Sequence, residues 1–200
     1  MARITNDQIK EYSRGGGSFF SLKDGESANV RFLYNTYADI PAFVVHEYAK
    51  NNNYATIDCG RQAGDPLDMC KWCAGGNKPV VRVVLAVYNE DAQEIQYWKR
   101  SGSWLESELK PYLDEIPVGQ PISGQVYKIK RTGKTMNDTK YTPIPAGIND
   151  GKTKDQFGEV KDPFEMNIIK PTDCDFDPNG TANTSDNSMP QSTRRTTDVF

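Results

Sequence analysis

The sequence predicts a mainly β protein organised around a metal-binding loop. Three observations support this fold class. Short runs of alternating apolar and polar residues recur along the chain, as expected for half-buried strands. Only one stretch carries apolar residues at helical spacing. The chain of 200 residues can bury one core, and a long segment rich in Asn, Gly, Asp and Cys interrupts its strands.

The N-terminal part predicts a flexible arm followed by two strands. Residues 1–17 are expected to form the arm, which ends in three consecutive glycines. Residues 28–34 alternate between apolar and polar side chains and predict the first strand. The second predicted strand, residues 41–48, carries His46 near its end.

The middle of the chain predicts two hairpins separated by a short helix. The nearly continuous apolar run 79–88 predicts a central strand covered on both faces, and residues 94–101 predict the return strand. Residues 103–116 have helical spacing, with Ser103 as the expected N-cap. A second hairpin is expected over residues 124–145.

Five or six strands with one short helix suit a small closed barrel of the OB type. We therefore predict an OB-like domain over residues 18–148, in which residues 49–78 are an inserted zinc-binding loop. Residues 149–170 show no clear pattern and are expected to be a linker or a peripheral segment. Asp, Asn, Ser, Thr and Pro dominate residues 171–200, which predicts a disordered acidic tail ending in Phe200.

The strongest functional signal is the stretch that begins at His46, the only histidine of the chain. Twelve residues separate His46 from Cys59, ten separate Cys59 from Cys70, and Cys70 and Cys73 form a C-x-x-C pair. Zinc prefers four such ligands in a closed tetrahedron when its role is structural. The pattern therefore predicts one structural Zn²⁺ held by one His and three Cys, with no open position for a catalytic water.

Other interpretations of these cysteines are less well supported. A redox C-x-x-C pair usually lies where a strand enters a helix, whereas loop-like sequence flanks this pair on both sides. A disulfide framework would need a secretory context, and the chain has few Cys for its length and no signal peptide. Buried thiols beside a buried His remain a plain alternative. Cys174 lies outside the cluster and is interpreted as incidental.

Charge and aromatic content indicate a nucleic-acid partner. The formal net charge is −3, but residues 150–200 hold six Lys or Arg against ten Asp or Glu, so the rest of the chain is nearly neutral and can carry a basic groove. Aromatic and basic residues are interleaved at 97–100, 127–131 and 139–141, as in proteins that bind single strands. Such residues are also common on solvated strand faces and in cores. No apolar run is long enough to span a bilayer, so no membrane association is expected.

Residues 28–113 resemble the core of the single-stranded DNA-binding (helix-destabilising) proteins of the T-even phages. The resemblance rests on the stretch Val30-Arg31-Phe32-Leu33 and on the four metal-ligand positions that follow it, with one extra residue between the second and third ligands. It implies an OB barrel with an inserted zinc subdomain. The chain is considerably shorter than members of that family, and its N-terminus lacks the dense basic patch that the family uses for cooperative binding.

The resemblance implies a protein that coats and protects single-stranded DNA during replication, recombination and repair, independently of sequence. Trp98 and Tyr141 are then expected to stack on bases. Trp72, between the two C-x-x-C ligands, either extends the groove or shields the ion. The expected phosphate contacts are Arg82, Arg100, Lys128, Lys130 and Lys134.

The last three residues, Asp198-Val199-Phe200, resemble the acidic, aromatic-terminated tails of bacterial and other phage single-strand binders. This resemblance implies that the tail recruits replication or recombination proteins. Zinc thiolates fit a reducing compartment, so the protein is expected in the cytoplasm, which would be that of the host cell if a phage encodes it. Oligomeric state and the choice between DNA and RNA stay open.

Two other classes of function compete with this prediction. A zinc-stabilised adaptor that binds replication or transcription proteins would account for the cysteines equally well. An enzyme such as a nuclease is disfavoured, because no pair of carboxylates has convincing spacing and no Gly-rich phosphate loop precedes a helix. We therefore predict that the protein is not an enzyme.

Overall fold

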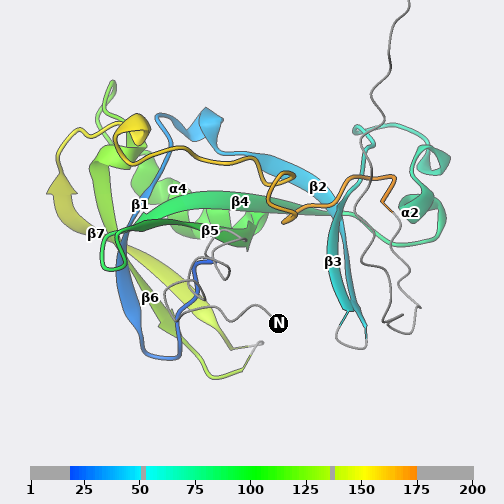
Figure 1. Cartoon of the computed structure of the whole chain (residues 1–200), viewed down its shortest axis with the longest axis horizontal. Helices are drawn as coiled ribbons and strands as arrows, with labels where there is room; N and C mark the ends of the chain where they lie inside the picture. The colour runs from blue at the N-terminus through cyan, green and yellow to red at the C-terminus, as the bar shows by residue number, and fades with distance from the viewer. Residues whose placement is uncertain (1–18, 51–52, 136–137, 175–200) are drawn as a thin grey trace, which may run out of the picture.

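The computed structural model describes residues 19–50, 53–135 and 138–174 (Figure 1). The predictions for the N-terminal arm and for the tail residues Asp198, Val199 and Phe200 lie outside these ranges. Within the described parts of the chain, no helix has both the length and the apolar character that crossing a bilayer requires.

One antiparallel sheet contains all seven strands of the described chain, which confirms the mainly β prediction. Their order is β3-β2-β4-β1-β6-β7, and β5 pairs with the other edge of β4. The strands are β1 (Ser27–Phe32), β2 (Ala42–Lys50), β3 (Asn53–Asp58), β4 (Val80–Asn89), β5 (Glu94–Ser101), β6 (Gln125–Thr132) and β7 (Lys140–Asn149). These pairings leave the sheet open, so the predicted closed barrel is replaced by a small open β domain.

Strand β4 is the centre of the sheet because three strands pair with it. Residues 80–83 pair with β2 and residues 87–89 with β1, while β5 pairs with residues 82–89 on the other edge. Five consecutive residues, 83–87, are buried, which confirms the prediction of a strand covered on both faces. β4 thereby connects the two parts of the molecule that are seen at the left and right of Figure 1.

The predicted helix forms over residues 102–113, as α3 (Gly102–Trp104), a π-helical turn η3 (Leu105–Leu109) and α4 (Lys110–Leu113). Three leucines four residues apart, Leu105, Leu109 and Leu113, are buried and fix this segment to the core. The prediction of Ser103 as the N-cap is wrong, because the cap lies two residues earlier. The Ser101 side chain instead accepts a hydrogen bond from the backbone N–H of Trp104, as an N-cap does.

The predicted loop 49–78 contains more regular structure than its composition suggests. Its first part is β3, which pairs with β2 along its whole length. Two short helical turns follow, η2 (Leu67–Met69) and α2 (Lys71–Ala74). We refer to the residues 46–50 and 53–78 as the metal arm, which extends to the right in Figure 1. A separate small buried cluster, with Ile57 and Trp72 among its members, holds the arm together.

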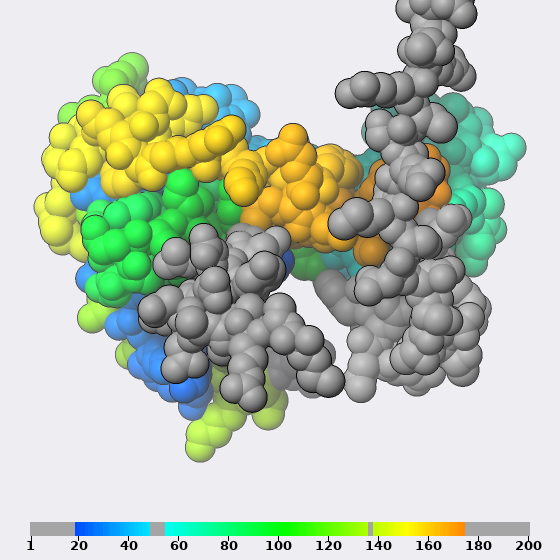
Figure 2. All heavy atoms as spheres, viewed as in Figure 1, coloured from blue at the N-terminus to red at the C-terminus, as the bar shows by residue number. Residues whose placement is uncertain are grey.

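The C-terminal strap, residues 154–174, lies on the periphery of the sheet and crosses to the metal arm. Figure 2 shows this segment in yellow and orange between the two parts. Phe157 packs on Tyr88 and Phe164 packs on Phe43, with ring centroids 4.9 and 5.7 Å apart. Near its end, the backbone of Lys170 bonds to residues 56 and 58 of β3. The strap therefore fixes the arm relative to the sheet.

Candidate metal centre and nucleic-acid interface

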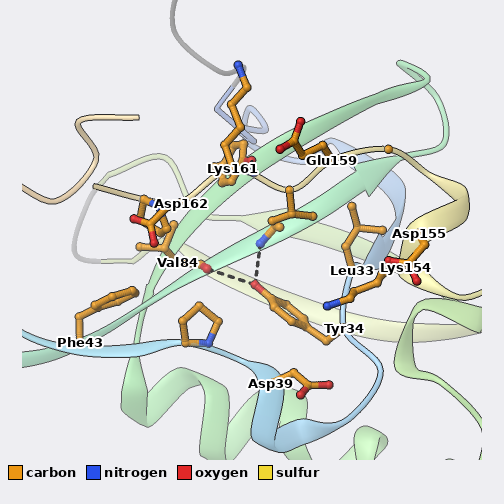
Figure 3. A pocket seen from close by; sticks show the side chains of 16 residues that line it. Leu33, Tyr34, Asp39, Phe43, Val84, Lys154, Asp155, Glu159, Lys161 and Asp162 are labelled. Carbon is orange, nitrogen blue, oxygen red and sulfur yellow. Dashed lines mark hydrogen bonds between the residues drawn. The ribbon is translucent and has the colours of Figure 1, made fainter. Parts of the chain in front are cut away.

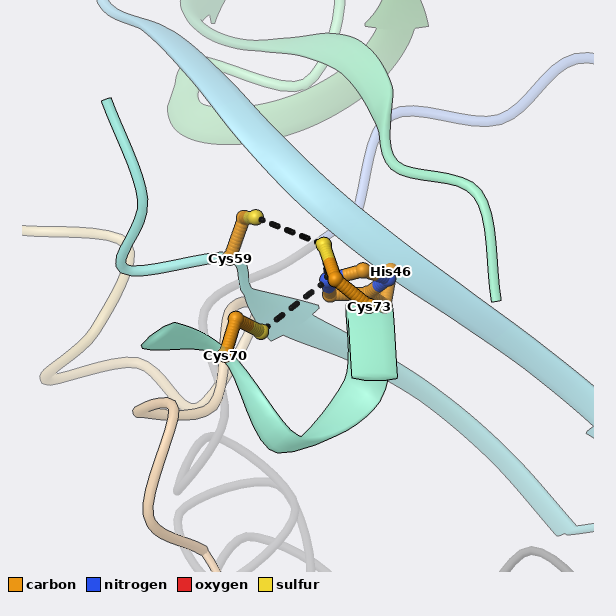
Figure 4. A group of neighbouring side chains, drawn as sticks. All are labelled: His46, Cys59, Cys70 and Cys73. Carbon is orange, nitrogen blue, oxygen red and sulfur yellow. Dashed lines mark hydrogen bonds between the residues drawn. The ribbon is translucent and has the colours of Figure 1, made fainter. Parts of the chain in front are cut away.

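The four predicted metal ligands, His46, Cys59, Cys70 and Cys73, meet in the metal arm (Figure 4). All four side chains are buried, and their ligand atoms all lie within 4.8 Å of one another. The Cys59 and Cys73 sulfurs are 3.7 Å apart, and the His46 Nε2 lies 3.4 Å from the Cys70 sulfur and 3.6 Å from the Cys73 sulfur. This buried His/Cys group lies at metal-binding distance.

Backbone pairing explains how ligands distant in sequence converge. His46 on β2 lies opposite Ile57 on β3, and Cys59 follows directly after β3. The N–H of Cys59 donates to the carbonyl of Val44, which keeps this ligand beside β2. The two remaining ligands share one turn of helix, because Cys70 is the residue before α2 and Cys73 lies within it.

Two residues outside the ligand set contact the ligands directly. Asn77 Oδ1 lies 3.0 Å from His46 Nδ1, so a proton on that nitrogen leaves Nε2 free for the ion. Arg61 donates a hydrogen bond of 3.2 Å to the sulfur of Cys73. Burial alone would raise the pKa of the Cys73 thiol, but hydrogen bonds from Arg61 and the neighbouring thiols lower it. A lowered pKa favours the thiolate that a metal needs.

Trp72 shields this centre. It is buried, its indole N–H donates to the carbonyl of Thr172 at 2.9 Å, and its ring packs on Tyr48 with centroids 5.3 Å apart. Of the two roles left open by the sequence, the structure supports shielding and does not place Trp72 in a groove.

A cavity of about 370 Å³ lies where β5, β7, β3 and the strap meet. Its lining includes the predicted residues Trp98, Arg100 and Tyr141, with Lys99 and Lys170 beside them. It also includes Phe19, whose side chain is 59% exposed. Aromatic and cationic groups therefore gather in one concave site, as nucleic-acid-binding surfaces require.

Arg100 is the centre of this site. Its guanidinium carbon lies 4.9, 5.9 and 4.4 Å from the ring centroids of Trp98, Trp104 and Tyr141. Burial lowers the pKa of Arg100. Among the described residues no carboxylate forms an ion pair with it. A half-buried cation without a carboxylate partner is suited to an anionic ligand.

The structure does not support Trp98 as a platform for base stacking. Its side chain is 4% exposed, and Phe20, Trp104 and Tyr141 pack against it with centroids 5.1, 4.8 and 5.2 Å apart. Trp98 faces the core beside Leu85 on β4, and its role is to support the Arg100 guanidinium.

Arg82 also has a different role from the one predicted. Both its Nε and an Nη donate to the carboxylate of Glu47, at 3.0 and 2.5 Å. Lys99 lies 3.2 Å from the same carboxylate and donates to Thr56 at 2.6 Å. Burial raises the pKa of Glu47, but these two cations outweigh it and lower the pKa to about 2. The group ties the base of the metal arm to β4 and β5.

The predicted lysines of the second hairpin point away from the cavity. Strand register places Lys128 opposite Ile144 and Lys130 opposite Thr142, whereas Tyr141 lies opposite Arg131. Because adjacent residues of a strand point to opposite faces, Lys128 and Lys130 lie on the other face from Tyr141. Both are exposed, and so is Lys134 in the hairpin turn. None of the three lines the cavity.

A larger cavity, of about 490 Å³, lies under the strap beside Val84 and Ala86 of β4 (Figure 3). The Tyr34 side chain lines this cavity, and its hydroxyl donates to the carbonyl of Val84 and accepts from the N–H of Ala86. Lysines and carboxylates both line its roof, and no arrangement of them indicates catalysis. The smaller cavity therefore gives the better candidate site, despite its size.

Sequence reasoning missed Phe19, Lys170, Arg61 and Asn77. Phe19 and Lys170 belong to segments without strand periodicity, and only the fold brings them to the cavity. Arg61 and Asn77 lie inside the metal segment, but polar residues are ordinary in such a loop and gave no separate signal. Comparison with protein-family models and with characterised proteins finds no match to this sequence.

Proposed function

We propose that the protein binds single-stranded DNA at the Arg100 cavity, without sequence preference, and that a structural Zn²⁺ clamps the metal arm that forms one wall of the site. The observation that carries the proposal is Arg100, a half-buried cation held among three aromatic rings and facing a cavity. Such a group would bind a phosphate, while the exposed Phe19 and the partly buried Tyr141 would contact bases.

The ligand set supports zinc as the ion. With Zn–S near 2.3 Å and Zn–N near 2.0–2.1 Å, a regular tetrahedron has S···S edges of about 3.8 Å and S···N edges of about 3.5 Å. Three of the six separations match these edges, at 3.7 Å between two sulfurs and 3.4 and 3.6 Å from sulfur to nitrogen, and all six lie within 4.8 Å. Soft thiolates with one imidazole favour zinc over magnesium or calcium. Four protein ligands give the ion a structural role.

The residues would act together as follows. Arg100 would meet the phosphate, and Trp98 beneath it would hold the guanidinium plane in place. Lys170 would add a second positive charge from the strap. Because these contacts address the backbone and the faces of bases, binding would be sequence-tolerant. The proposed cellular role is protection of single strands during replication, recombination or repair.

A titration with oligothymidylate across ionic strength tests the proposal. Wild-type protein should bind, quench its tryptophan fluorescence, and lose affinity as salt rises. Arg100→Gln should weaken binding by about tenfold, or about 1.4 kcal/mol, and reduce the salt slope by roughly 0.7. Lys110→Gln, on α4 and outside the cavity, serves as the matched control. Equal binding of duplex, or a response to salt that stays flat, would refute the proposal.

A zinc-stabilised adaptor is the second candidate, and one observation favours it. A cavity of about 470 Å³ between η1 (Tyr37–Asp39), β4 and α3 is lined mainly by apolar side chains, including Ile40, Val81 and Leu105. Val81 is 48% exposed. Such a surface suits a protein partner. Zinc at one equivalent without any response to oligothymidylate would favour this alternative.

A further inference from the structure

Arg61 is held against the metal centre by the loop that contains it. One guanidinium nitrogen, Nη1, donates to the Cys73 sulfur at 3.2 Å, and the other, Nη2, donates to the carbonyl of Asp65. The Asp65 carboxylate in turn accepts from the N–H of Gln62 at 2.8 Å, which closes the loop. Arg61 Nε is buried and has no hydrogen-bond partner among the described residues. Because this one nitrogen is buried without a hydrogen bond, the position of the guanidinium requires a compensating interaction.

The charge of the centre supplies that interaction. A divalent ion with three thiolates and one neutral imidazole carries a net charge of −1. Arg61 provides the one positive charge in direct contact with a ligand sulfur among the described residues. The nearby Lys71 instead places its ammonium over the ring of Trp72, 4.7 Å from the centroid. The positive charge of Arg61 offsets this net charge of −1.

We propose that Arg61 is a positioning residue that neutralises the metal centre and helps to retain the ion. This inference rests on the zinc centre proposed above. Its positive charge and hydrogen bond stabilise the anionic Cys73 sulfur and fix the direction of that ligand, so the bond to the ion is lost less readily.

The rate of zinc transfer to a chromogenic chelator tests this inference on the full chain. Arg61→Gln, which removes the charge, should release zinc about tenfold faster than the wild type. Arg61→Lys, which keeps the charge but loses the planar pair of donors, should release it at an intermediate rate. Lys78→Gln removes a positive charge from the exposed surface of the same arm and should behave as the wild type.

The outcomes separate this inference from the proposed function. Wild-type release from Arg61→Gln would overturn it, and so would acceleration by Lys78→Gln equal to that of Arg61→Gln. Wild-type protein without zinc would overturn the metal centre itself. If Arg61→Gln does not fold, Arg61→Lys still decides. Faster release than from the wild type would support the role of the paired donors, and release at the wild-type rate would overturn it.

Discussion

Removing the ion should unfold the metal arm while the rest of the sheet stays folded. Between Cys59 and Lys78 the only helical elements are η2 and α2, of three and four residues. Isolated helices of this length are not stable in water. The largest apolar side chain there is Trp72, whose burial is worth about 1.5–3 kcal/mol. A structural zinc contributes an apparent ~10–16 kcal/mol, so the ion dominates the stability of this segment.

The main core does not depend on the ion in the same way. The residues of the metal arm form a buried cluster of their own, separate from the large cluster around β4. Chelation should therefore leave the thermal transition of the sheet in place and expose the arm to protease. Trypsin can cleave after Arg61 and Lys71, whereas Pro79 blocks cleavage after Lys78.

Limited trypsin digestion before and after treatment with a chelator is the assay. The apo protein should be cut within residues 59–78 much faster than the holo protein, and re-addition of zinc should restore protection. Cys70→Ser should be cut quickly with or without the ion, whereas Cys174→Ser, outside the ligand set, should resemble the wild type. Equal resistance of apo and holo protein would refute the reasoning.

Three further predictions concern single groups. The pKa of Glu47 in the folded protein, about 2, lies below its ordinary value of 4.5, so its pairing stabilises the fold above pH 4.5 and is lost as pH falls toward 2. At neutral pH the wild type should be more stable than Glu47→Gln by roughly 1–2 kcal/mol. Urea titrations should show this difference disappear between pH 4.5 and pH 2. Asn77→Ala should weaken zinc affinity about tenfold in chelator competition, since Asn77 orients His46; unchanged affinity would exclude that role. Replacing both Lys128 and Lys130 by Gln should change oligothymidylate affinity by less than about threefold, because exposed charges on the far face are screened; a loss as large as that of the cavity variant would contradict the assigned faces.

The metal centre could be predicted from sequence because its signal is local. A C-x-x-C pair defines two ligands within one turn, and Cys59 and the single His46 leave few other combinations. The strands were predictable for the same reason, since β1, β5 and β6 alternate between apolar and polar residues and β4 is a nearly continuous apolar run. β3 was missed because its residues, Asn53–Asp58, begin beside an Asn-rich stretch and include few apolar side chains.

Long-range pairing accounts for the other differences. Alternation placed Trp98 and Arg100 on one face, but it does not say that Phe20 and Trp104 cover that face. In the same way, nothing near Arg82 in the sequence indicates that Glu47, on the neighbouring strand β2, forms an ion pair with it.

The strap was not predictable because isolated residues fix it in place. Phe157 and Phe164 each pack on one ring of the sheet, without any periodicity between them. Closure of a barrel likewise depends on pairing between the two edge strands of the sheet, which are far apart in sequence. The described strands do not form that pairing.

The X-ray absorption spectrum at the zinc edge, recorded on protein purified without chelators, tests the metal-clamped arm most directly. The proposed zinc centre predicts one zinc per chain with three sulfur ligands near 2.3 Å and one nitrogen ligand near 2.0–2.1 Å. A spectrum dominated by nitrogen and oxygen ligands, or folded protein that contains no stoichiometric metal, would contradict it.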